Sequence, residues 1–454
     1  MIMLDALPGI KRFLAGVALS DHVSGFLIRL MAAFLGHVGR MSASQAAGSI
    51  RTQARHRAAV IRFLANLGYS KNWCVLAELA ELVLKAEQRR GGRWVFIVDQ
   101  TYCGQQGQKT ENTFSRANYR PRPKNSNRRQ KKHAKRSCHG LVMGLLLTLS
   151  GLRLPCFRAY YTEAYCRQRK VPYGTQTELA AELIRTVLVP AEAAVVVLGD
   201  TAFDADSIRG ACRERSFTWI VPVNPERVLA GAKGQRPKVT SLVKNLSARQ
   251  FAAVRLKPSE GAFVAMRRVA RCRLGPKMKT RTFYVHRERR AVHHVGDVQL
   301  VFSTKLKPET GQDVAVQKIL MSSDDALSAA AVVEIYSLRW QIELFFKELK
   351  STLGLHQYRF RTFIKVEAWV AICLLTFLYL EWYRSQQLRK RNPTAKDKEW
   401  WHWQRSHGLC AAVRQEANEA ELIRLADWTR TPGGLKRLKK QLRAAIPLEY
   451  RRSA

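Results

Sequence analysis

Acidic residues are scarce in this chain. Its 454 residues include 35 Asp and Glu against 77 Lys and Arg, which gives a formal net charge of +42. Such self-repulsion does not stabilise a compact fold, so the excess of positive charge indicates a polyanionic partner. Nucleic acid and an anionic membrane surface both meet that requirement.

Long hydrophobic runs are also missing. The longest apolar run, residues 368–380, has 13 residues, whereas an α-helix needs about 20 to cross a bilayer. The N-terminal stretch MIMLDALPGIKRFLAG carries Asp5 early and lacks the charged, apolar and cleavage-site order of a signal peptide. We therefore favour nucleic acid over a membrane as the partner, and we expect a cytoplasmic protein.

Paired cysteines and clustered histidines are absent as well. The nine cysteines include no Cys-x-x-Cys pair, which argues against a zinc ribbon and fits a reducing cytosol. His293 and His294 have no partners at ligand spacing, so we interpret them as an ordinary pair of side chains. The 46% hydrophobic content excludes a disordered chain, and the length allows about two to four domains or one domain with insertions.

Residues 1–90 show helical periodicity throughout and predict an all-α module. A short helix, a turn near residues 48–49 and a longer basic helix follow one another in the order of a helix-turn-helix, whose second helix enters the major groove. The longer helix carries Arg51, Arg55, Arg57 and Arg62. A solvated basic face is the alternative, and under both interpretations the apolar side chains expected to pack inward are Ala58, Ile61 and Leu64.

A short apolar run, WVFIVDQ, ends the helical module and predicts a buried strand. The turn-rich TYCGQQGQ follows, so we expect Asp99 at the exit of that strand. A carboxylate there is well placed for chemistry, although ion pairing and turn capping are common roles for a single acid.

Residues 116–136 hold ten Lys and Arg and no acid. Two prolines and an Asn-Ser-Asn run exclude a regular helix, so we expect a basic loop or hairpin tip that follows a phosphate backbone. Four of its cations are candidates for DNA binding: Arg128, Arg129, Lys131 and Lys132.

Strands and helices then alternate. Two strands are predicted with a turn near residues 150–151, followed by a helix over 175–188 that begins with a Thr cap. AAVVVLGD is a second buried strand that ends in a carboxylate, Asp200, and a helix over 203–215 and the strand FTWIVPV come next. This order predicts an α/β fold with a central mixed sheet flanked by helices.

The two strand-end acids can meet if their strands are neighbours in the sheet. Asp204 and Asp206 are nearby rivals of Asp200, but we place both of them inside the following helix, pointing away from the strand exit.

Residues 224–315 lack long helical patterns and contain β-like pieces, so we expect a β-rich insertion there. KILMSSDD predicts one more strand, after which Asp324 and Asp325 cap a helix that begins near Ala326 and runs through Glu343.

Residues 336–350 of that helix combine a polar stripe with an apolar face about 100° wide. The apolar face consists of Ile335, Leu338, Ile342, Phe345, Phe346, Leu349 and Leu353, and the stripe of Tyr336, Arg339, Glu343 and Lys350. A carboxylate between cations can bind a metal ion while the cations hold phosphate oxygens. A surface helix with an ordinary pair between Arg339 and Glu343 is the alternative.

The C-terminal part begins with an apolar stretch over residues 358–383 that predicts a core helix. A linker with a Pro stop follows, and the remaining residues are basic and helical in pattern, with Trp400, Trp401 and Trp403. This last region can pack on the preceding domain, bind DNA or pair two protomers, and the sequence leaves all three open.

Asp99, Asp200 and Glu343 together resemble the DDE triad of RNase H-like transposases. The helix adds the Tyr-x2-Arg-x3-Glu-x6-Lys signature of bacterial insertion-sequence transposases, and the resemblance covers roughly residues 40–383. Two features depart from the family pattern: Thr201 stands where many relatives carry Arg, and the basic segment 116–136 is longer and more charged.

The resemblance implies a division of the chain into four parts. They are a helical DNA-binding module (residues 1–90), an RNase H-like catalytic domain (91–223 and 316–385), a β-rich insertion (224–315) and a basic helical C-terminal region (386–454).

The resemblance also implies a metal site. Three clustered carboxylates repel one another unless divalent cations neutralise them, so two Mg²⁺ ions are expected, for which Mn²⁺ can substitute. Asp99 would bridge both ions while Asp200 and Glu343 each hold one. The family signature assigns phosphate binding to Tyr336, Arg339 and Lys350. Trp340 is a candidate for stacking on an extruded base, with ordinary packing as the alternative.

The implied function is cut-and-paste transposition, in which terminal inverted repeats are recognised and cleaved and the element is joined to target DNA. Synapsis of two ends implies a homodimer on double-stranded DNA. Two alternatives stay open: a catalytically inactive DNA-binding protein descended from a transposase, and a membrane-surface protein that uses the same basic charge.

Overall fold

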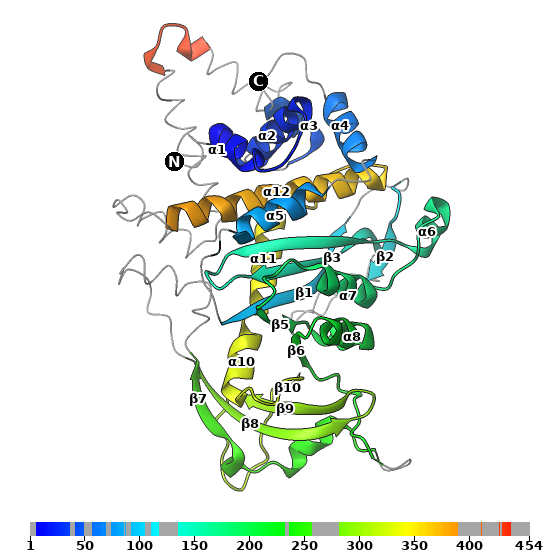
Figure 1. Ribbon diagram of the computed structural model, residues 1–454, viewed down its shortest axis with the longest axis vertical. Helices are drawn as coiled ribbons and strands as arrows, with labels where there is room; N and C mark the ends of the chain where they lie inside the picture. Colours follow the sequence, from blue (N-terminus) through cyan, green and yellow to red (C-terminus); the bar gives the residue numbers. More distant parts are fainter. Residues whose placement is uncertain are drawn as a thin grey trace, which may run out of the picture.

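Five strands form the centre of the protein (Figure 1). They lie in the order β4-β3-β1-β5-β6, in which β3 is antiparallel to both β4 and β1, whereas β5 is parallel to both β1 and β6. The bounds are β1 Arg93–Gly104, β3 Lys135–Leu147, β4 Arg153–Tyr160, β5 Ala194–Leu198 and β6 Thr218–Pro222. This is the mixed sheet of an RNase H-like domain, and the predicted α/β class is confirmed.

The computed structural model describes most of the chain. The residues described are 6–36, 41–49, 57–69, 74–85, 87, 92–104, 110–117, 135–231, 236–256, 281–388, 410, 426 and 429–436. Several predictions lie outside these ranges: Arg51, Arg55, Arg128, Arg129, Lys131, Lys132, Trp400, Trp401 and Trp403.

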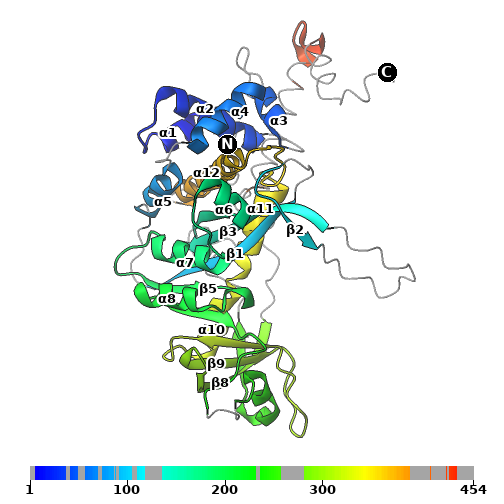
Figure 2. The ribbon, with the colours of Figure 1, turned by 90° about the vertical axis from the view of Figure 1, so that its right-hand side faces the viewer.

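Helices cover both faces of the sheet (Figure 2). α7 (Gln176–Thr186) and α8 (Asp206–Glu214) lie on one face, and α11 (Trp340–Ser351) lies on the other, against β1. The predicted Thr cap is confirmed, because Thr175 and Glu178 form a capping box at the start of α7. A further short helix, α6 (Glu163–Arg169), follows β4.

The sheet continues beyond β6 into the predicted β-rich region. β10 (Lys318–Ser322) pairs antiparallel with β6, and β9 (Gly296–Thr304), β8 (Arg281–Val292) and β7 (Ala252–Leu256) extend the sheet in turn. Two 3₁₀ helices, η2 (Val239–Asn245) and η3 (Ala248–Gln250), precede β7. At the opposite edge, β2 (Phe114–Ala117) pairs with the start of β3. The strands of the insertion are therefore continuous with the central sheet.

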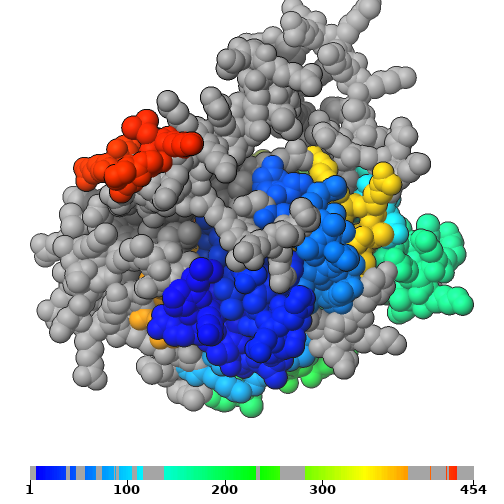
Figure 3. All heavy atoms as spheres, turned by 90° about the horizontal axis from the view of Figure 1, so that it is seen from above, coloured from blue at the N-terminus to red at the C-terminus, as the bar shows by residue number. Residues whose placement is uncertain are grey.

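The N-terminal helices form a separate layer that packs on α12 (Phe363–Leu388) (Figure 1). Seen from above, these helices, in blue, face the viewer (Figure 3). Aromatic contacts bind the two together: Phe34 lies 4.8 Å from Trp369 and Phe13 lies 5.7 Å from Tyr379, between ring centroids. The layer consists of α1 (Ala6–Leu14), α2 (Asp21–Gly36), α3 (Ala43–Ser49) and α4 (Arg57–Tyr69). α5 (Val75–Lys85) lies beside α12 and also contacts β4 (Figure 1).

The helix α12 is longer than its apolar run in the sequence. Residues Phe363–Gln386 are long and apolar enough to cross a membrane, but 83% of the most apolar window is buried inside the protein. The predicted core helix is thus observed, and its apolar length is explained by its burial between the N-terminal helices and the sheet.

Two details of the predicted helix-turn-helix differ. α3 and α4 have the predicted order, and Arg57 and Arg62 are exposed, but Ala58 is exposed as well and does not pack inward. Leu64 is buried as predicted and Ile61 is half-buried, and the rest of the buried face of α4 consists of Val60, Phe63 and Leu67. The helix is rotated from the predicted orientation because Phe63 stacks on Phe26 of α2, with ring centroids 4.2 Å apart.

Candidate active site

The register of β1 and β5 brings the two candidate aspartates to the same level of the sheet. The last parallel pair joins Ile97 to Leu198, and Asp99 and Asp200 each lie two residues further along. Residues two apart in an extended chain point to the same face, so both carboxylates leave the sheet together on its carboxyl-end side.

Asp99 does not lie at a strand exit as predicted. β1 continues to Gly104, and Asp99 sits opposite Met143 of β3. The pairing with β5 stops at Ile97 while the antiparallel pairing with β3 goes on, which extends the strand past the end of its apolar run. Asp99 is therefore held by a strand on one side only and is buried, with its Oδ1 accepting from the Gln100 amide at 2.7 Å.

Asp200 is fixed by a local turn. It precedes the 3₁₀ helix η1 (Thr201–Phe203), and its Oδ1 accepts from the Ala202 amide at 2.9 Å. Its rival Asp204 is fully buried between Arg209 and Arg227, and α8 begins only at Asp206. Asp204 thus lies before the helix rather than inside it, and its carboxylate is used to anchor the turn.

The predicted helix that carries Glu343 is two helices. α10 (Ala329–Ser337) and α11 are joined by a tight turn, in which Leu338 and Arg339 donate their amides to the carbonyls three residues earlier. The N-cap of α10 is Ser328, not Asp324 or Asp325. The turn places Arg339 at the start of α11, one helical turn before Glu343.

Arg339 connects two of the three acids. Its guanidinium lies 3.2 Å from Asp99 Oδ2 and 2.5 Å from Glu343 Oε1. The i,i+4 pair that the sequence offered as an alternative does form, but the same arginine also reaches β1, 240 residues away in the chain. Glu343 and Asp99 therefore face a shared cation.

Electrostatics place the third acid beside them. Burial and the negative charges of Asp200 and Glu343 raise the pKa of Asp99, the Gln100 amide and Arg339 oppose the rise, and the net result is a pKa of about 6. Burial and the charges of Asp200 and Asp99 likewise raise the pKa of Tyr336 against the effect of Arg339, to a net value of about 12. These five residues form one cluster on the α11 side of the sheet.

The donor set suits a hard divalent cation, which binds carboxylate oxygens. Within the described residues no three acidic, His or Cys side chains are arranged to hold a metal ion. Arg339 pairs with one oxygen of Asp99 and one of Glu343. Burial is the largest cause of the raised pKa of Asp99, and repulsion by Asp200 and Glu343 adds to it; added positive charge relieves that repulsion. Binding a metal through these oxygens thus competes with Arg339.

The other predicted DNA-binding residues are spread around this cluster. Trp340, beside Arg339, is 57% exposed. Lys350 lies two turns beyond Glu343, about 10 Å along the axis, with its Nζ 6.0 Å from the Phe346 ring centroid. Arg57 is exposed on the N-terminal layer. Of the signature residues, the structure gathers Tyr336, Arg339 and Glu343, and leaves Lys350 at the far end of α11.

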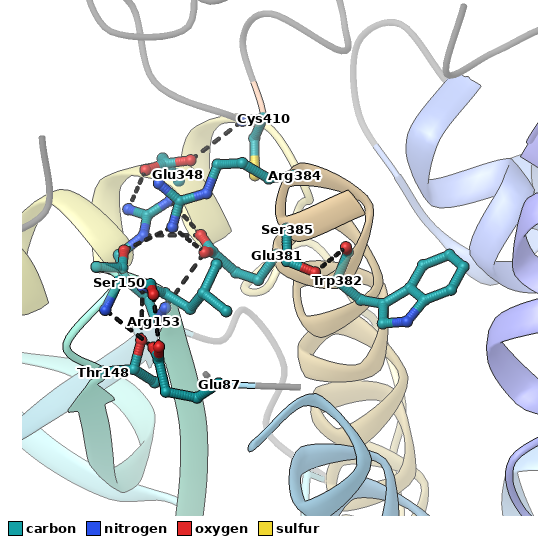
Figure 4. Close-up of polar contacts among 12 residues, drawn as sticks. Glu87, Thr148, Ser150, Arg153, Glu348, Glu381, Trp382, Arg384, Ser385 and Cys410 are labelled. Carbon is teal, nitrogen blue, oxygen red and sulfur yellow. Dashed lines mark hydrogen bonds and ion pairs between the residues drawn. The ribbon is translucent and has the colours of Figure 1, made fainter. Parts of the chain in front are cut away.

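A buried ionic network behind the cluster was not predicted (Figure 4). Arg153 of β4 donates to Glu348 of α11 at 2.7 Å and to Glu381 of α12 at 2.9 Å, and the second Glu348 oxygen accepts from the Cys410 amide at 3.1 Å. The partners are far apart in the chain, so no local pattern signals them. Lys318 of β10 was missed too: its Nζ lies 4.9 Å from the Tyr336 ring centroid.

Comparison with known proteins agrees with this geometry. The family described as the transposase DDE domain matches residues 90–379, a range that contains all three acids and the whole signature. A search of curated proteins found no match. Since the match covers more than half of the chain and coincides with the mixed sheet and α11, the protein belongs to the DDE-domain transposases, a family of phosphoryl-transfer enzymes that act on DNA with divalent metal ions.

Proposed function

We propose that the protein is a cut-and-paste transposase that cleaves the terminal inverted repeats of its element and joins the ends to target DNA. The observation that carries the proposal is Arg339, which joins Asp99 to Glu343 beside Asp200. Catalysis of phosphoryl transfer depends on positioning and charge, and this cluster has acids and cations within one surface.

Asp99, Asp200 and Glu343 would hold two Mg²⁺ ions, or Mn²⁺ in their place, with Asp99 shared between them. Such ions activate an attacking hydroxyl and neutralise charge on the leaving oxygen of a phosphodiester. When Asp99 and Glu343 hold metal ions, Arg339 would be released from them, and its planar guanidinium would offer a pair of donors that fits phosphate oxygens.

The remaining side chains orient the DNA. Tyr336 keeps its phenolic proton throughout the physiological range because its pKa is raised to about 12, so it can donate a hydrogen bond to a phosphate. Lys350 meets the backbone further along α11, and Trp340 offers an exposed indole for stacking on an unpaired base. Arg55, Arg57 and the basic segment with Arg128, Arg129, Lys131 and Lys132 would contact the duplex away from the cleavage point.

Two copies would act together in the cytoplasm, at the nucleoid, because two transposon ends must be cut and joined in one complex. A non-catalytic DNA-binding protein descended from a transposase is the alternative, and it shares every expectation except cleavage.

The test is cleavage of a duplex that carries the inverted repeats flanking the gene, with Mg²⁺ or Mn²⁺ supplied. Glu343→Gln should lower the cleavage rate by about 10³-fold or more while DNA affinity stays within a factor of two or so. Glu334→Gln is the matched control, because Glu334 is an exposed glutamate on α10. Wild-type binding without cleavage under these conditions would favour the alternative, and full activity in Glu343→Gln would remove Glu343 from the site.

A further inference from the structure

Two lysines meet at one end of the β9–β10 hairpin. Lys318 is the first residue of β10 and pairs in register with Ser303 of β9. Lys305 follows β9 directly, and its amide donates to the side chain of Gln317 at 3.3 Å. The register therefore places both lysines at the same end of these two neighbouring strands.

Tyr336 lies between this end of the two strands and the cluster of Asp99, Asp200, Arg339 and Glu343. The Lys318 ammonium lies over the face of the Tyr336 ring, 4.9 Å from its centroid. The phenol of the same ring interacts with Arg339, and the negative charges of Asp200 and Asp99 raise its pKa. One aromatic ring thus separates Lys318 from the acids.

Neither lysine is neutralised by an acid in the described part of the chain. Partial desolvation lowers the pKa of Lys318, and the positive charges of Arg339 and Lys305 lower it further. Other cations of the same sheet region do have acidic partners: Arg289 pairs with Asp297 and Asp325, and Arg290 with Glu288. The unpaired charge is concentrated where the hairpin approaches Tyr336.

Packing on the aromatic rings does not account for this arrangement. A cation over a tyrosine face is weakly stabilised, and Lys305 is 5.9 Å from the Phe283 centroid, but neither contact requires a second lysine nearby. Like charges at short range oppose each other unless an anion is brought between them. A phosphodiester is the anion that the partner of this family supplies.

We propose that Lys318 and Lys305 form a phosphate-binding subsite that holds a backbone phosphate close to the scissile phosphate, on the strand that is cut. The subsite lies outside the Tyr-Arg-Glu-Lys signature and is supplied by the strands that enter α10. It rests on the proposed function for the position of the scissile phosphate, but DNA binding by the two lysines can be measured without cleavage.

The experiment compares full-length wild type with Lys318→Met, Lys305→Met and the double variant. Affinity for a duplex carrying the terminal repeat and for an unrelated duplex of equal length is measured over a range of salt concentrations. Each lost phosphate contact should reduce the slope of log Kd against log salt by about 0.9, equally on both duplexes. Lys244→Met is the matched control, because Lys244 is an exposed lysine on η2 of the insertion.

A second arm locates the contact. Single uncharged methylphosphonates are placed along the strand that is cut, and each duplex is tested with wild type and with Lys318→Met. At one position near the cleavage point, the substitution should weaken wild-type binding but leave the variant unaffected. Unchanged salt slopes, an equal change in Lys244→Met, or the absence of any such position would overturn the subsite. Wild type that binds DNA but never cleaves it would instead overturn the proposed function, and the salt slopes would still decide on the lysines.

Discussion

Arg153 and Glu348 form a 2.7 Å ion pair that joins β4 to α11, the helix that carries Glu343. Both side chains are about nine-tenths buried, and Arg153 also binds Glu381 of α12 and lies 4.8 Å over the Phe377 ring. Because Glu348 is five residues after Glu343, this pair sets how α11 lies against the sheet.

Removal of Arg153 should therefore be costly. Arg153→Met leaves buried Glu348 without a cation and Glu381 with Arg384 as its cation, and we expect the free energy of unfolding to fall by about 3 to 5 kcal/mol. Urea titration followed by circular dichroism measures the change. Arg185→Met serves as control, since its pair with Glu214 is half exposed and should contribute less than about 1 kcal/mol. If the two variants lost the same free energy of unfolding, the buried Arg153 pair would be no more stabilising than the exposed Arg185 pair.

Glu367 should make stability fall as pH rises. Burial raises the pKa of Glu367 from 4.5 to about 7. The Tyr161 hydroxyl, which donates to the Glu367 carboxylate at 2.6 Å, and the positive charge of Arg169 oppose this rise. The folded chain then binds the proton more tightly than the unfolded chain, so the stabilisation is complete below about pH 4.5 and is lost through pH 7. The resulting loss in the free energy of unfolding has an upper limit of about 3 kcal/mol. Glu367 lines an open groove, and solvent there makes the loss smaller than this limit.

The measurement is the urea midpoint of wild type and Glu367→Gln at several pH values from 5 to 8. Gln can still accept from Tyr161 but does not titrate, so the variant should lose less stability over this range than wild type. Parallel curves for the two proteins would mean that Glu367 does not carry the pH dependence.

Gly144 should not tolerate a side chain. It lies on β3 opposite Val98 of β1, and an added Cβ would overlap the Phe96 ring and approach Cys156 Sγ to 2.6 Å. Gly144→Ala should destabilise the fold by about 1 to 3 kcal/mol through overpacking. Gly210→Ala is the converse case: it lies inside α8 with nothing within 4 Å of the new methyl group, and should stabilise by about 0.5 to 1 kcal/mol. Thermal unfolding of both variants tests the contrast, and a stable Gly144→Ala protein would contradict it.

Trp340 should matter for DNA chemistry but not for folding. Its side chain is 57% exposed, so Trp340→Ala should leave the free energy of unfolding unchanged within about 0.5 kcal/mol. Loss of one base-stacking contact, worth about 1 to 3 kcal/mol, should slow cleavage of the terminal repeat about 10- to 100-fold. Trp340→Phe should keep most of the rate. Leu188→Ala removes an exposed apolar side chain beside α7 and should have no effect on cleavage; an equal effect from both alanine variants would point to a general surface effect.

Features encoded by neighbouring residues were predicted well. Thr175 and Glu178 form the capping box that starts α7, and the turn between β3 and β4 contains Gly151 at a φ of 77°, where glycine is favoured. The spacing of Tyr336, Arg339 and Glu343 indicated a shared site because residues three and four apart lie on one side of a helical segment.

Features without a local sequence signal were not predicted. The break between α10 and α11 carries no Gly or Pro, and the amides of Leu338 and Arg339 make the turn with hydrogen bonds that any residue can form. The extension of β1 past Asp99 depends on β3, whose strand begins 36 residues later.

The sequence by itself determined which residue types could do chemistry here: acids after two apolar runs, a third acid on an amphipathic helical segment, and a charge of +42 that requires a polyanion. These are local or additive properties, so they survive without coordinates. Only the tertiary structure decided that Arg339 spans Asp99 and Glu343, that Arg153 anchors α11 from behind, and that Lys318 stands beside Tyr336. Those contacts join strands and helices far apart in the chain, and pairing at that range is fixed by the packing of the whole sheet and its layers.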